Sequence, residues 1–383
     1  MRLFENHPHT LIIIWKILLI VFIFSIPLVF FLIYQKPPVM LNPIRIEDEK
    51  FQEDDVQAES VFQPKTPSIN QIFNSDHKWV ATLSAGRIRT VITTGDIIPA
   101  RTVNFEILRH KDFNWPYLKT YQLTNASDIT FANLESPEIK NCPMTNEGMI
   151  FCGDYRNIEG LMFAGIDVVS LANNHAGNYG EEGVKETIDH LKYAGIETTG
   201  TALSNLVIKD IRGIRFAFLG FNDISKNQPG ISDVDEGKIK NDIREAEMQA
   251  KIVIVTFHWG AEYKDQPDER QKYLGHLAVN AGADLVIGNH PHWIQPVEIY
   301  KDKLITYSHG NFVFDQEWSI KTKQGVIGKY TFYDDKLIDA EFFPLQIENY
   351  GQPYFLTGDK KQKILYEIGK ASMMMSTILE VNK

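Results

Sequence analysis

The sequence predicts an α/β domain preceded by an N-terminal membrane-spanning helix. From Ile88 onward, short apolar runs of strand length alternate with helical patterns. Six of these runs end in polar residues of the types that bind ligands. A long uncharged stretch near the amino terminus predicts the membrane helix.

The composition is that of a globular protein that does not bind nucleic acid. Of 383 residues, 44% are hydrophobic and 11% aromatic, and the net charge is -10. No cluster of Lys and Arg alternates with aromatic residues. The electrostatic footprint of a nucleic-acid-binding protein is therefore missing.

Residues 1–35 are predicted to be a cytoplasmic amino terminus followed by a single-pass membrane anchor. Residues 17–34 (ILLIVFIFSIPLVFFLIY) carry no charge, and with the apolar residues 11–15 they can cross a hydrocarbon core of about 30 Å. A cleaved signal peptide is the alternative, but the apolar run exceeds the usual ~7–15 residues and no A-x-A-like site follows it. Positive residues flank the run on both sides, so charge does not decide its orientation.

Residues 36–85 are predicted to form an acidic linker. Within them, residues 47–59 carry seven acidic side chains against one lysine, a composition that stays solvated. The domain is predicted to occupy residues 86–350, and a C-terminal helix residues 351–383.

Helices are expected at residues 180–195, 235–250 and 268–282, of which the first and third end at glycine. Residues 326–347 are predicted to form a hairpin around Asp334 and Asp335, and residues 359–380 an amphipathic terminal helix.

Cys142 and Cys152 are the only cysteines, and they bracket a loop-like segment. Outside the membrane they can form a disulfide, whereas in the cytoplasm they would stay reduced. Their spacing does not resemble a zinc site. The sequence leaves a disulfide and two free thiols as open alternatives.

The polar residues at the ends of the six strand-like runs are the candidate functional residues. The runs end at Asp96, at Asn133 and Glu135, at Asn174 and His175, at His258, at His290 and His292, and at His309 and Asn311. In α/β sheets, ligands bind at the carboxyl ends of the strands, so these side chains are expected to share one cleft.

Two of these units are alike. Residues 164–175 and 281–292 each leave a helix through Ala-Gly, continue into a strand and finish on Asn-His. The same arrangement of helix, tight turn and strand is therefore expected twice in the fold.

A metal centre is the chemistry that this set predicts. Its ligands would be Asp96, Glu135, Asn174, His258, His290 and His292. Oxygen and imidazole ligands together suit Zn, Mn or Fe better than Ca or Mg, and a bridging carboxylate would let six ligands serve two divalent ions about 3.5–4 Å apart. Each residue alone also has a structural explanation, such as a turn for the histidines of GNHPHWIQP. The prediction rests on their shared position at strand ends.

Six motifs carry a family resemblance. TGDIIPAR, FANLESPE, LANNHAGNYG, HWGAEY, GNHPHWIQ and HGNFVFDQ follow in this order across residues 94–316. The series resembles the CapA-like capsule-biosynthesis family, associated with poly-γ-glutamate capsules, which is similar to a branch of the calcineurin-like metallophosphoesterase superfamily. The resemblance implies a metallophosphoesterase-like sandwich of two β-sheets flanked by helices.

The resemblance also implies an extracytoplasmic domain, and with it the cytoplasmic amino terminus that charge alone does not decide. It implies roles for individual residues as well. Asp96 and His292 would hold one ion, Asn174, His258 and His290 the other, Glu135 would bridge them, and His175 would be the general acid that protonates the leaving group.

The chain departs from the wider pattern at three places. Ile98 stands where the superfamily has the histidine of Asp-x-His, so the first ion is expected to be held weakly. No arginine closely follows Glu135, and Arg101 either replaces that phosphate-binding arginine or lies on the surface. His309 stands where the family usually has Leu, as either a spare ligand or a harmless exchange.

Two functions remain open. The first is a metal-dependent hydrolase or transferase in an extracytoplasmic domain at the cell membrane, acting on a phosphoester or an anionic capsule polymer. The second is a non-catalytic scaffold or export component that binds polymer or membrane-bound capsule-synthesis proteins. The anchor and linker argue against an intracellular phosphodiesterase.

Overall fold

The computed structural model describes residues 62–381; residues 1–61 and 382–383 lie outside the described part. The predicted anchor and the acidic run at residues 47–59 fall outside it and stay predictions. The chain divides into two units, Met1–Ser60 and Val61–Lys383, and only the second is described below. Within residues 62–381, no helix is both long and apolar enough to cross a membrane.

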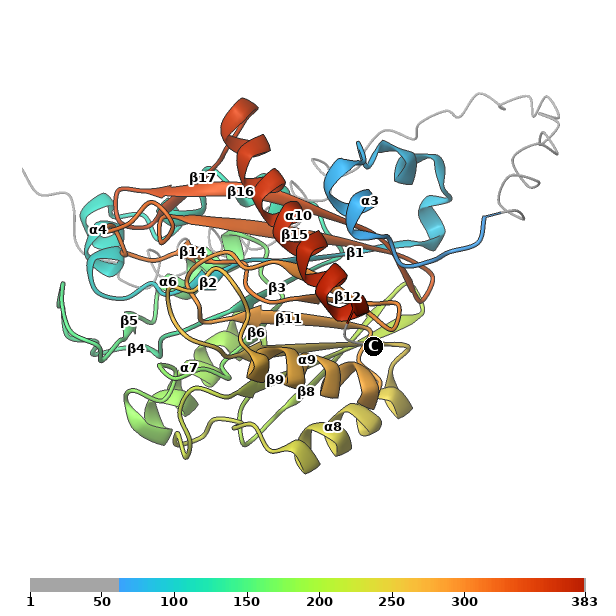
Figure 1. Ribbon diagram of the computed structural model, residues 1–383. Coiled ribbons are helices and arrows are strands. Elements are labelled where there is room, and N and C mark those ends of the chain that lie inside the picture. The colour runs from blue at the N-terminus through green and yellow to red at the C-terminus, as the bar shows by residue number, and fades with distance from the viewer. Residues whose placement is uncertain (1–61, 382–383) are drawn as a thin grey trace, which may run out of the picture. The chain divides into compact units, whose positions relative to one another are not determined.

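Two mixed β-sheets form the centre of the domain (Figure 1). The first has seven strands in the order β17(Gln352–Phe355), β16(Lys336–Glu348), β15(Gln324–Tyr333), β1(Ile88–Thr93), β3(Ile129–Asn133), β6(Val168–Ser170) and β7(Glu197–Thr199). The second has six, in the order β12(Val297–Tyr300), β13(Lys303–Thr306), β11(Leu285–Asn289), β10(Ile252–His258), β9(Ile214–Asn222) and β8(Leu206–Ile211).

Each sheet has a parallel half that presents its carboxyl ends at one edge. Strands β1, β3, β6 and β7 run parallel in the first sheet, and β9, β10, β11 and β13 in the second. Two short ribbons join segments near these edges, β2(Asp96–Ile97) with β14(Asn311–Val313), and β4(Glu138–Ile139) with β5(Gly153–Asp154). The six predicted strand runs correspond to β1, β3, β6, β10, β11 and β13.

The core lies between the sheets. Phe131 of β3 stacks on Phe218 of β9 with ring centroids 5.5 Å apart, and both rings are buried. Because neighbouring residues of a strand face opposite sides, Ala132 instead packs on the outer face of the first sheet. A strand buried on both faces reads as a continuous apolar run, which is how these strands appeared in the sequence.

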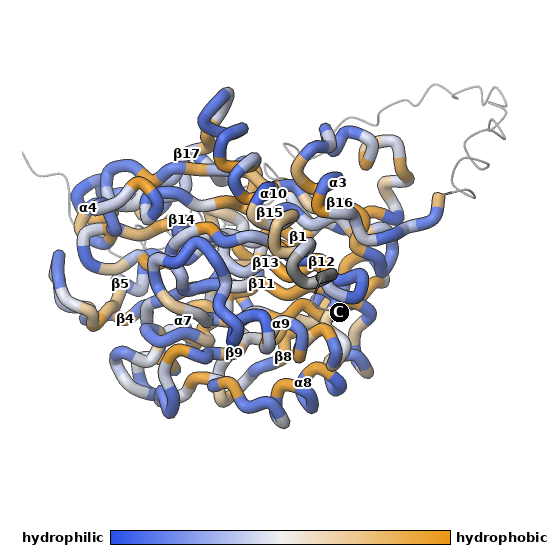
Figure 2. Tube along the Cα trace, viewed as in Figure 1, coloured by the Kyte–Doolittle hydropathy of each residue, from blue (hydrophilic) through white to orange (hydrophobic). Residues whose placement is uncertain are grey.

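Helices cover the outer faces of both sheets. On the first sheet lie α4(Thr102–His110), α6(Asn157–Phe163) and α7(Gly180–Tyr193); on the second lie α8(Glu236–Gln249) and α9(Glu269–Ala281). Figure 2 shows α8 alternating hydrophobic and hydrophilic residues, as expected of a helix with one buried face. Short helices α5(Tyr121–Thr124), η1(Lys78–Thr82), η2(Ala85–Arg87) and η3(Trp115–Tyr117) complete the connections. The two-sheet architecture flanked by helices is as predicted.

The predicted helices at residues 180–195, 235–250 and 268–282 are confirmed as α7, α8 and α9. Helix α9 starts at a capping box of Asp268 and Gln271 and ends at Gly282, whose φ is 124°. Gly165 after α6 also has a positive φ, of 70°. The two similar sequence units thus use the same helix-to-strand turn, once in each sheet.

The C-terminal hairpin and the terminal helix are confirmed, but the helix does not begin at residue 351, because Gln352–Phe355 pair with β16 as strand β17. Strands β15 and β16 form the hairpin, with Asp334 in its turn at a φ of 51°. The terminal helix is α10(Gly358–Val381), which packs against β12, β16 and α3(Ile69–Asn74), as seen in red at the front of Figure 1.

The linker prediction was wrong at its C-terminal end. Residues 62–85, placed in the linker, contain α3, which begins at a capping box of Ser68 and Gln71. Ile69 and Ile72 are buried in the same cluster as Ile364 and Ile368 of α10. The acidic composition of residues 47–59 was extended in the prediction to the whole segment up to residue 85. Helix α3 is short, and its apolar face meets its partner, α10, only in the tertiary structure.

We predict that Ile72→Ala lowers the free energy of unfolding by about 2–5 kcal/mol, because its side chain is buried between α3, α10 and the first sheet. Asn70→Ala, on the exposed side of the same helix, is the control. Urea denaturation of both variants measures the difference. Equal stabilities would show that residues 62–85 are a linker after all.

Candidate metal centre

The predicted ligands lie together where the carboxyl ends of the parallel strands of the two sheets meet, and all of them except the half-buried Asn174 are buried. Asp96 is 0% exposed, Glu135 0%, His258 1%, His290 4% and His292 3%. Two groups place their ligand atoms within 4.8 Å of one another, Glu135 with His290 and His292, and Asp96 with Glu135 and His258. The shared cleft expected from the strand ends is therefore a single buried centre.

Three atoms of ligand type converge on His258 Nε2. Asn174 Oδ1 lies 2.7 Å from it, His290 Nδ1 3.1 Å and Glu135 Oε1 3.3 Å. The Nδ2 group of Asn133 lies 3.4 Å from His258 Nδ1. His258 Nε2 is within hydrogen-bonding distance of Asn174 and His290, so the ligand-type atoms of these side chains and of Glu135 share one small space.

Glu135 Oε1 makes no hydrogen bond although it is fully buried. Leaving a buried acceptor without a donor costs about 1–3 kcal/mol, more for a charged group. Ligands that bind one ion at about 2.1 Å lie about 3 Å from one another, as these atoms do. Glu135, Asn174, His258 and His290 therefore fit a divalent cation.

Asp96 and His292 form the other half of the centre. His292 Nδ1 lies 3.2 Å from Asp96 Oδ2 and 2.8 Å from Asn311 Oδ1. The Nδ2 group of Asn311 donates to Gln316 and to the carbonyl of Thr322, so its Oδ1 faces the histidine. His292 Nδ1 is consequently a donor, and Nε2 is the nitrogen free to bind an ion.

Burial and the short distances shift the pKa values in opposite directions. Burial raises the pKa of Glu135 well above its usual range, and repulsion from Asp96 adds to the effect. Burial also opposes ionisation of Asp96, but the hydrogen bond and charge of His292 outweigh it and lower the Asp96 pKa. Burial disfavours the charged form of His292, yet Asp96 and Glu135 raise its pKa to about 9.

The other two histidines are neutral. Burial lowers the pKa of His258 to about 3, and burial with repulsion from His258 lowers that of His290 well below its usual range. Neutral imidazoles are the form that binds metals. The centre thus presents two neutral histidines beside a His292–Asp96 ion pair.

The histidine triplet is held in an uncommon backbone conformation. His290 has a φ of 95° and His292 a φ of 56°, which cost about 1–3 kcal/mol each for residues with a Cβ. The His290 amide donates to Asp96 Oδ2 at 3.3 Å, and the Pro291 carbonyl accepts from Tyr263. Before the triplet, a Cβ on Gly288 would lie 2.0 Å from the Tyr307 carbonyl. The His-Pro-His triplet is therefore a strained turn that also supplies two candidate ligands, His290 and His292.

Two asparagines beside the candidate ligands hold the centre in place. Asn133 Nδ2 donates to Asp96 Oδ1 at 2.8 Å and lies 3.5 Å from Glu135 Oε2. Asn173 Nδ2 in turn donates to Asn133 Oδ1 at 3.1 Å. The signal was their position beside the ligands in the motifs FANLES and LANNH.

His175 lies next to the centre rather than in it. Its Nδ1 is 3.0 Å from Asn178 Oδ1, and its ring stacks on Phe151 with centroids 4.0 Å apart. Burial lowers its pKa to about 4.

His309 is not a spare ligand. Its Nε2 lies 2.8 Å from the Tyr330 hydroxyl and 3.2 Å from Thr93 Oγ1, inside the first sheet. Of the two alternatives for this residue, a structural exchange is therefore correct.

Arg101 does not lie free on the surface. Its side chain is 11% exposed and pairs with Asp315, and its Nη1 donates to the Gly148 carbonyl at 3.0 Å. Ile98, in place of the superfamily's histidine, packs with Ala100, Phe151 and Phe314. An apolar cluster therefore occupies the position from which a further ligand to the first ion would come.

Cys142 and Cys152 form a disulfide with Cα atoms 5.7 Å apart, which resolves the alternative left open by the sequence.

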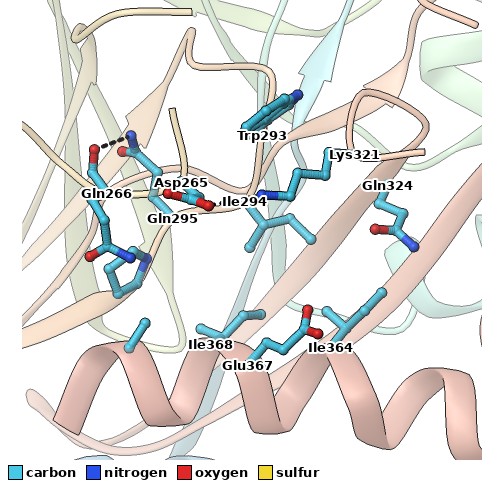
Figure 3. Close-up of a pocket in the computed structure, with 12 residues that line it drawn as sticks. Asp265, Gln266, Trp293, Ile294, Gln295, Lys321, Gln324, Ile364, Glu367 and Ile368 are labelled. Carbon is cyan, nitrogen blue, oxygen red and sulfur yellow. Dashed lines mark hydrogen bonds and ion pairs between the residues drawn. The ribbon is translucent and has the colours of Figure 1, made fainter. Parts of the chain in front are cut away.

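A cavity of about 300 Å³ is lined by Trp293 and Ile294, the two residues that follow His292 in the chain (Figure 3). Lys321 Nζ lies 4.3 Å from the centroid of the Trp293 ring and 2.8 Å from Asp265. Ile364, Glu367 and Ile368 of α10 line the opposite side. The cavity combines an apolar floor with charges of both signs.

Comparison with known proteins places the chain. Residues 90–316 match the family described as bacterial capsule synthesis protein PGA_cap. The chain is 32% identical to the capsule biosynthesis protein CapA of Bacillus anthracis over 298 residues, 72% of each chain. It is 31% identical to the PGA biosynthesis protein CapA of Bacillus subtilis, covering 73% of this chain and 77% of that protein.

The chain belongs to the PGA_cap family. Its six motifs, read from the sequence as a family resemblance, lie within or at the edge of the matched residues. A phosphatase structure from Mycoplasma pneumoniae aligns with 69% of the chain and 95% of its own at 12% identity, with a TM-score of 0.47. That score is too low to support a functional inference about this PGA_cap protein.

We predict that Glu135→Gln weakens binding of Mn²⁺ or Zn²⁺ at least about tenfold, because it removes the charge from the carboxylate shared by both ligand groups. Isothermal titration with each metal measures the affinity. The matched control is Glu138→Gln, a buried carboxyl three residues along that is hydrogen-bonded by Ser136 and Asn157. Equal loss in both variants would mean that Glu135 acts only through folding.

Glu138 also predicts a pH dependence of stability. Burial raises its pKa from 4.5 to about 8, so the folded state keeps a proton that the unfolded state releases. Its stabilising contribution is complete below pH 4.5 and is lost as pH rises towards 8, by roughly 1.4 kcal/mol per pKa unit. Glu138→Gln has no such proton to lose. Denaturation at pH 5 and pH 9 should therefore show the variant gaining on the wild type at pH 9; a constant difference would contradict the shift.

Proposed function

We propose that this PGA_cap protein is a metal-dependent hydrolase or transferase of capsule biosynthesis that acts on a phosphoester or on an anionic capsule polymer. The observation that carries the proposal is the convergence of Glu135, Asn174 and His290 on His258 Nε2, with Glu135 Oε1 buried and without a hydrogen-bond partner. Buried lone pairs in this arrangement are matched by a cation, and a scaffold protein has no need to maintain them.

Two divalent ions, of Mn, Zn or Fe, fit the ligand set. Following the family resemblance, Asn174, His258 and His290 would hold one ion and Asp96 and His292 the other; Glu135, the member common to both groups of neighbouring ligand atoms, would lie between them. The ion of Asp96 and His292 would have fewer ligands because Ile98 is packed among apolar side chains. When bound, the ions would supply an activated water and positive charge opposite the reacting group.

His175 serves proton transfer. Its Nδ1 hydrogen bonds to Asn178, which leaves Nε2 without a hydrogen in the neutral ring. To act as the general acid, His175 must first take up a proton at Nε2. A bound anionic group favours this uptake, since opposite charge stabilises an imidazolium that burial disfavours.

The substrate class follows from the relatives and the charges. The similar proteins are named for capsule and PGA biosynthesis, which suggests an anionic polymer. The net charge of -10 repels such a chain, so the attraction must be local. Lys321 and Trp293 in the cavity of Figure 3 offer one cationic and one apolar contact beside His292.

An extracytoplasmic, membrane-anchored domain is part of the proposal. The Cys142–Cys152 disulfide supports it, because disulfides persist in oxidising compartments and are rare in the cytosol. Membrane-bound capsule-synthesis proteins are the partners that such a location suggests.

A non-catalytic scaffold or export component is the second candidate. It is favoured by Ile98 in the apolar cluster and by the engagement of Arg101 with Asp315, which together leave the first ion and a phosphate group with fewer contacts. This function would bind polymer without turnover.

We predict that His175→Ala lowers kcat about 10²–10⁴-fold while the bound metal per chain is unchanged, because His175 moves a proton and binds no ion. The full-length chain, loaded with Mn²⁺ or Zn²⁺, is assayed with a phosphodiester and with poly-γ-glutamate. His290→Ala is the control that should lose metal and turnover together. Turnover that survives His175→Ala excludes the proton-transfer role, and polymer binding without turnover in the wild type selects the scaffold.

A further inference from the structure

The loop closed by the disulfide reaches the candidate site with one side chain. Cys142 and Cys152 close a loop in which Met149 and Ile150 are 61% and 64% exposed. Phe151, the last residue before the second cysteine, is 1% exposed and stacks on His175 at an interplanar angle of 26°. The loop thus exposes Met149 and Ile150 and buries Phe151, whose ring stacks on His175, together with Cys152.

Arg101 attaches this loop to the rest of the site. It donates to the Gly148 carbonyl at 3.0 Å and pairs with Asp315. Its guanidinium carbon lies 4.7 Å from the Phe151 ring centroid and 5.2 Å from that of Phe314. Arg101 itself has a φ of 50° and a ψ of -123°, a conformation uncommon for a residue with a Cβ. The strained residue is thus the one that joins the loop to Asp315, shortly after the end of β14.

The loop also determines which nitrogen of His175 carries the hydrogen. The Phe151 amide donates to Asn178 Oδ1 at 2.7 Å. A backbone amide can only donate, so the atom facing it is the oxygen of Asn178. The same oxygen lies 3.0 Å from His175 Nδ1, which must therefore donate as well. In the neutral ring, Nε2 is then left as an acceptor.

We propose that the disulfide-closed loop is a positioning element for His175. Phe151 fixes the plane of the imidazole by stacking, and the Phe151 amide, through Asn178, fixes its tautomer, while Cys142–Cys152 and Arg101 hold Phe151 in place. The inference rests on the proposed function for its catalytic meaning, but the tautomer and the ring position are properties of the protein without metal or substrate.

The test is nuclear magnetic resonance of the full-length chain labelled with ¹⁵N-histidine, without metal, at a pH where His175 is neutral. His175→Gln identifies the signals. The oxidised protein should show His175 with its hydrogen on Nδ1. Dithiothreitol reduces the disulfide to two thiols and is itself oxidised to its cyclic disulfide; after reduction, His175 should shift towards a mixture with the Nε2-bound hydrogen. An unchanged tautomer after complete reduction overturns the proposal.

Two variants separate positioning from folding. Phe151→Ala keeps the disulfide and removes the ring, and should increase the rate at which diethylpyrocarbonate modifies His175 several-fold, measured by mass spectrometry. Phe151→Tyr keeps the ring and should restore the wild-type rate. Met149→Ala, at an exposed position of the same loop, is the matched control. If all three variants modify at the wild-type rate, Phe151 does not shield His175. Because neither readout uses metal or turnover, failure of the proposed catalysis leaves this test intact.

Discussion

His258 Nε2 lies within 3.3 Å of Asn174 Oδ1, His290 Nδ1 and Glu135 Oε1. Glu135 Oε1 has no hydrogen-bond partner there, and an unsatisfied buried polar atom costs about 1–3 kcal/mol. Much of the surrounding structure holds these atoms in place against that cost. The strained turn at His290 and His292 places both imidazoles in the centre, and the asparagine pair of Asn133 and Asn173 supports Asp96.

The two-sheet architecture is what makes the cluster possible. Asn174 follows β6 in the first sheet, whereas His258 ends β10 and His290 follows β11 in the second. Only when the parallel halves of the two sheets place their carboxyl ends at a common edge do these residues meet. Phe131 and Phe218 pack between the two sheets and help to fix their relative position. The distances between the site residues of the two sheets therefore depend on the core.

A second layer of contacts tunes the residues around the centre. Asn311 orients His292, Asn178 orients His175, and the disulfide-closed loop supplies the ring that covers His175. Residues of this layer bind no ion, but they decide which nitrogen of each histidine is available. Ile98 has the opposite effect, because its apolar packing removes a ligand from one side of the centre.

The sequence by itself determined the elements and the membership of the site. Apolar runs and caps predicted the strands and helices α7, α8 and α9, because burial and capping are encoded locally. The position of polar residues after those runs predicted the six ligand candidates. The tertiary structure alone decided that His292 faces Asp96 while His309 faces Tyr330, that Arg101 is engaged by Asp315, and that α3 folds onto α10. Each of these outcomes depends on a partner more than twenty residues away in the chain. A local sequence pattern does not specify which distant residue a side chain will contact.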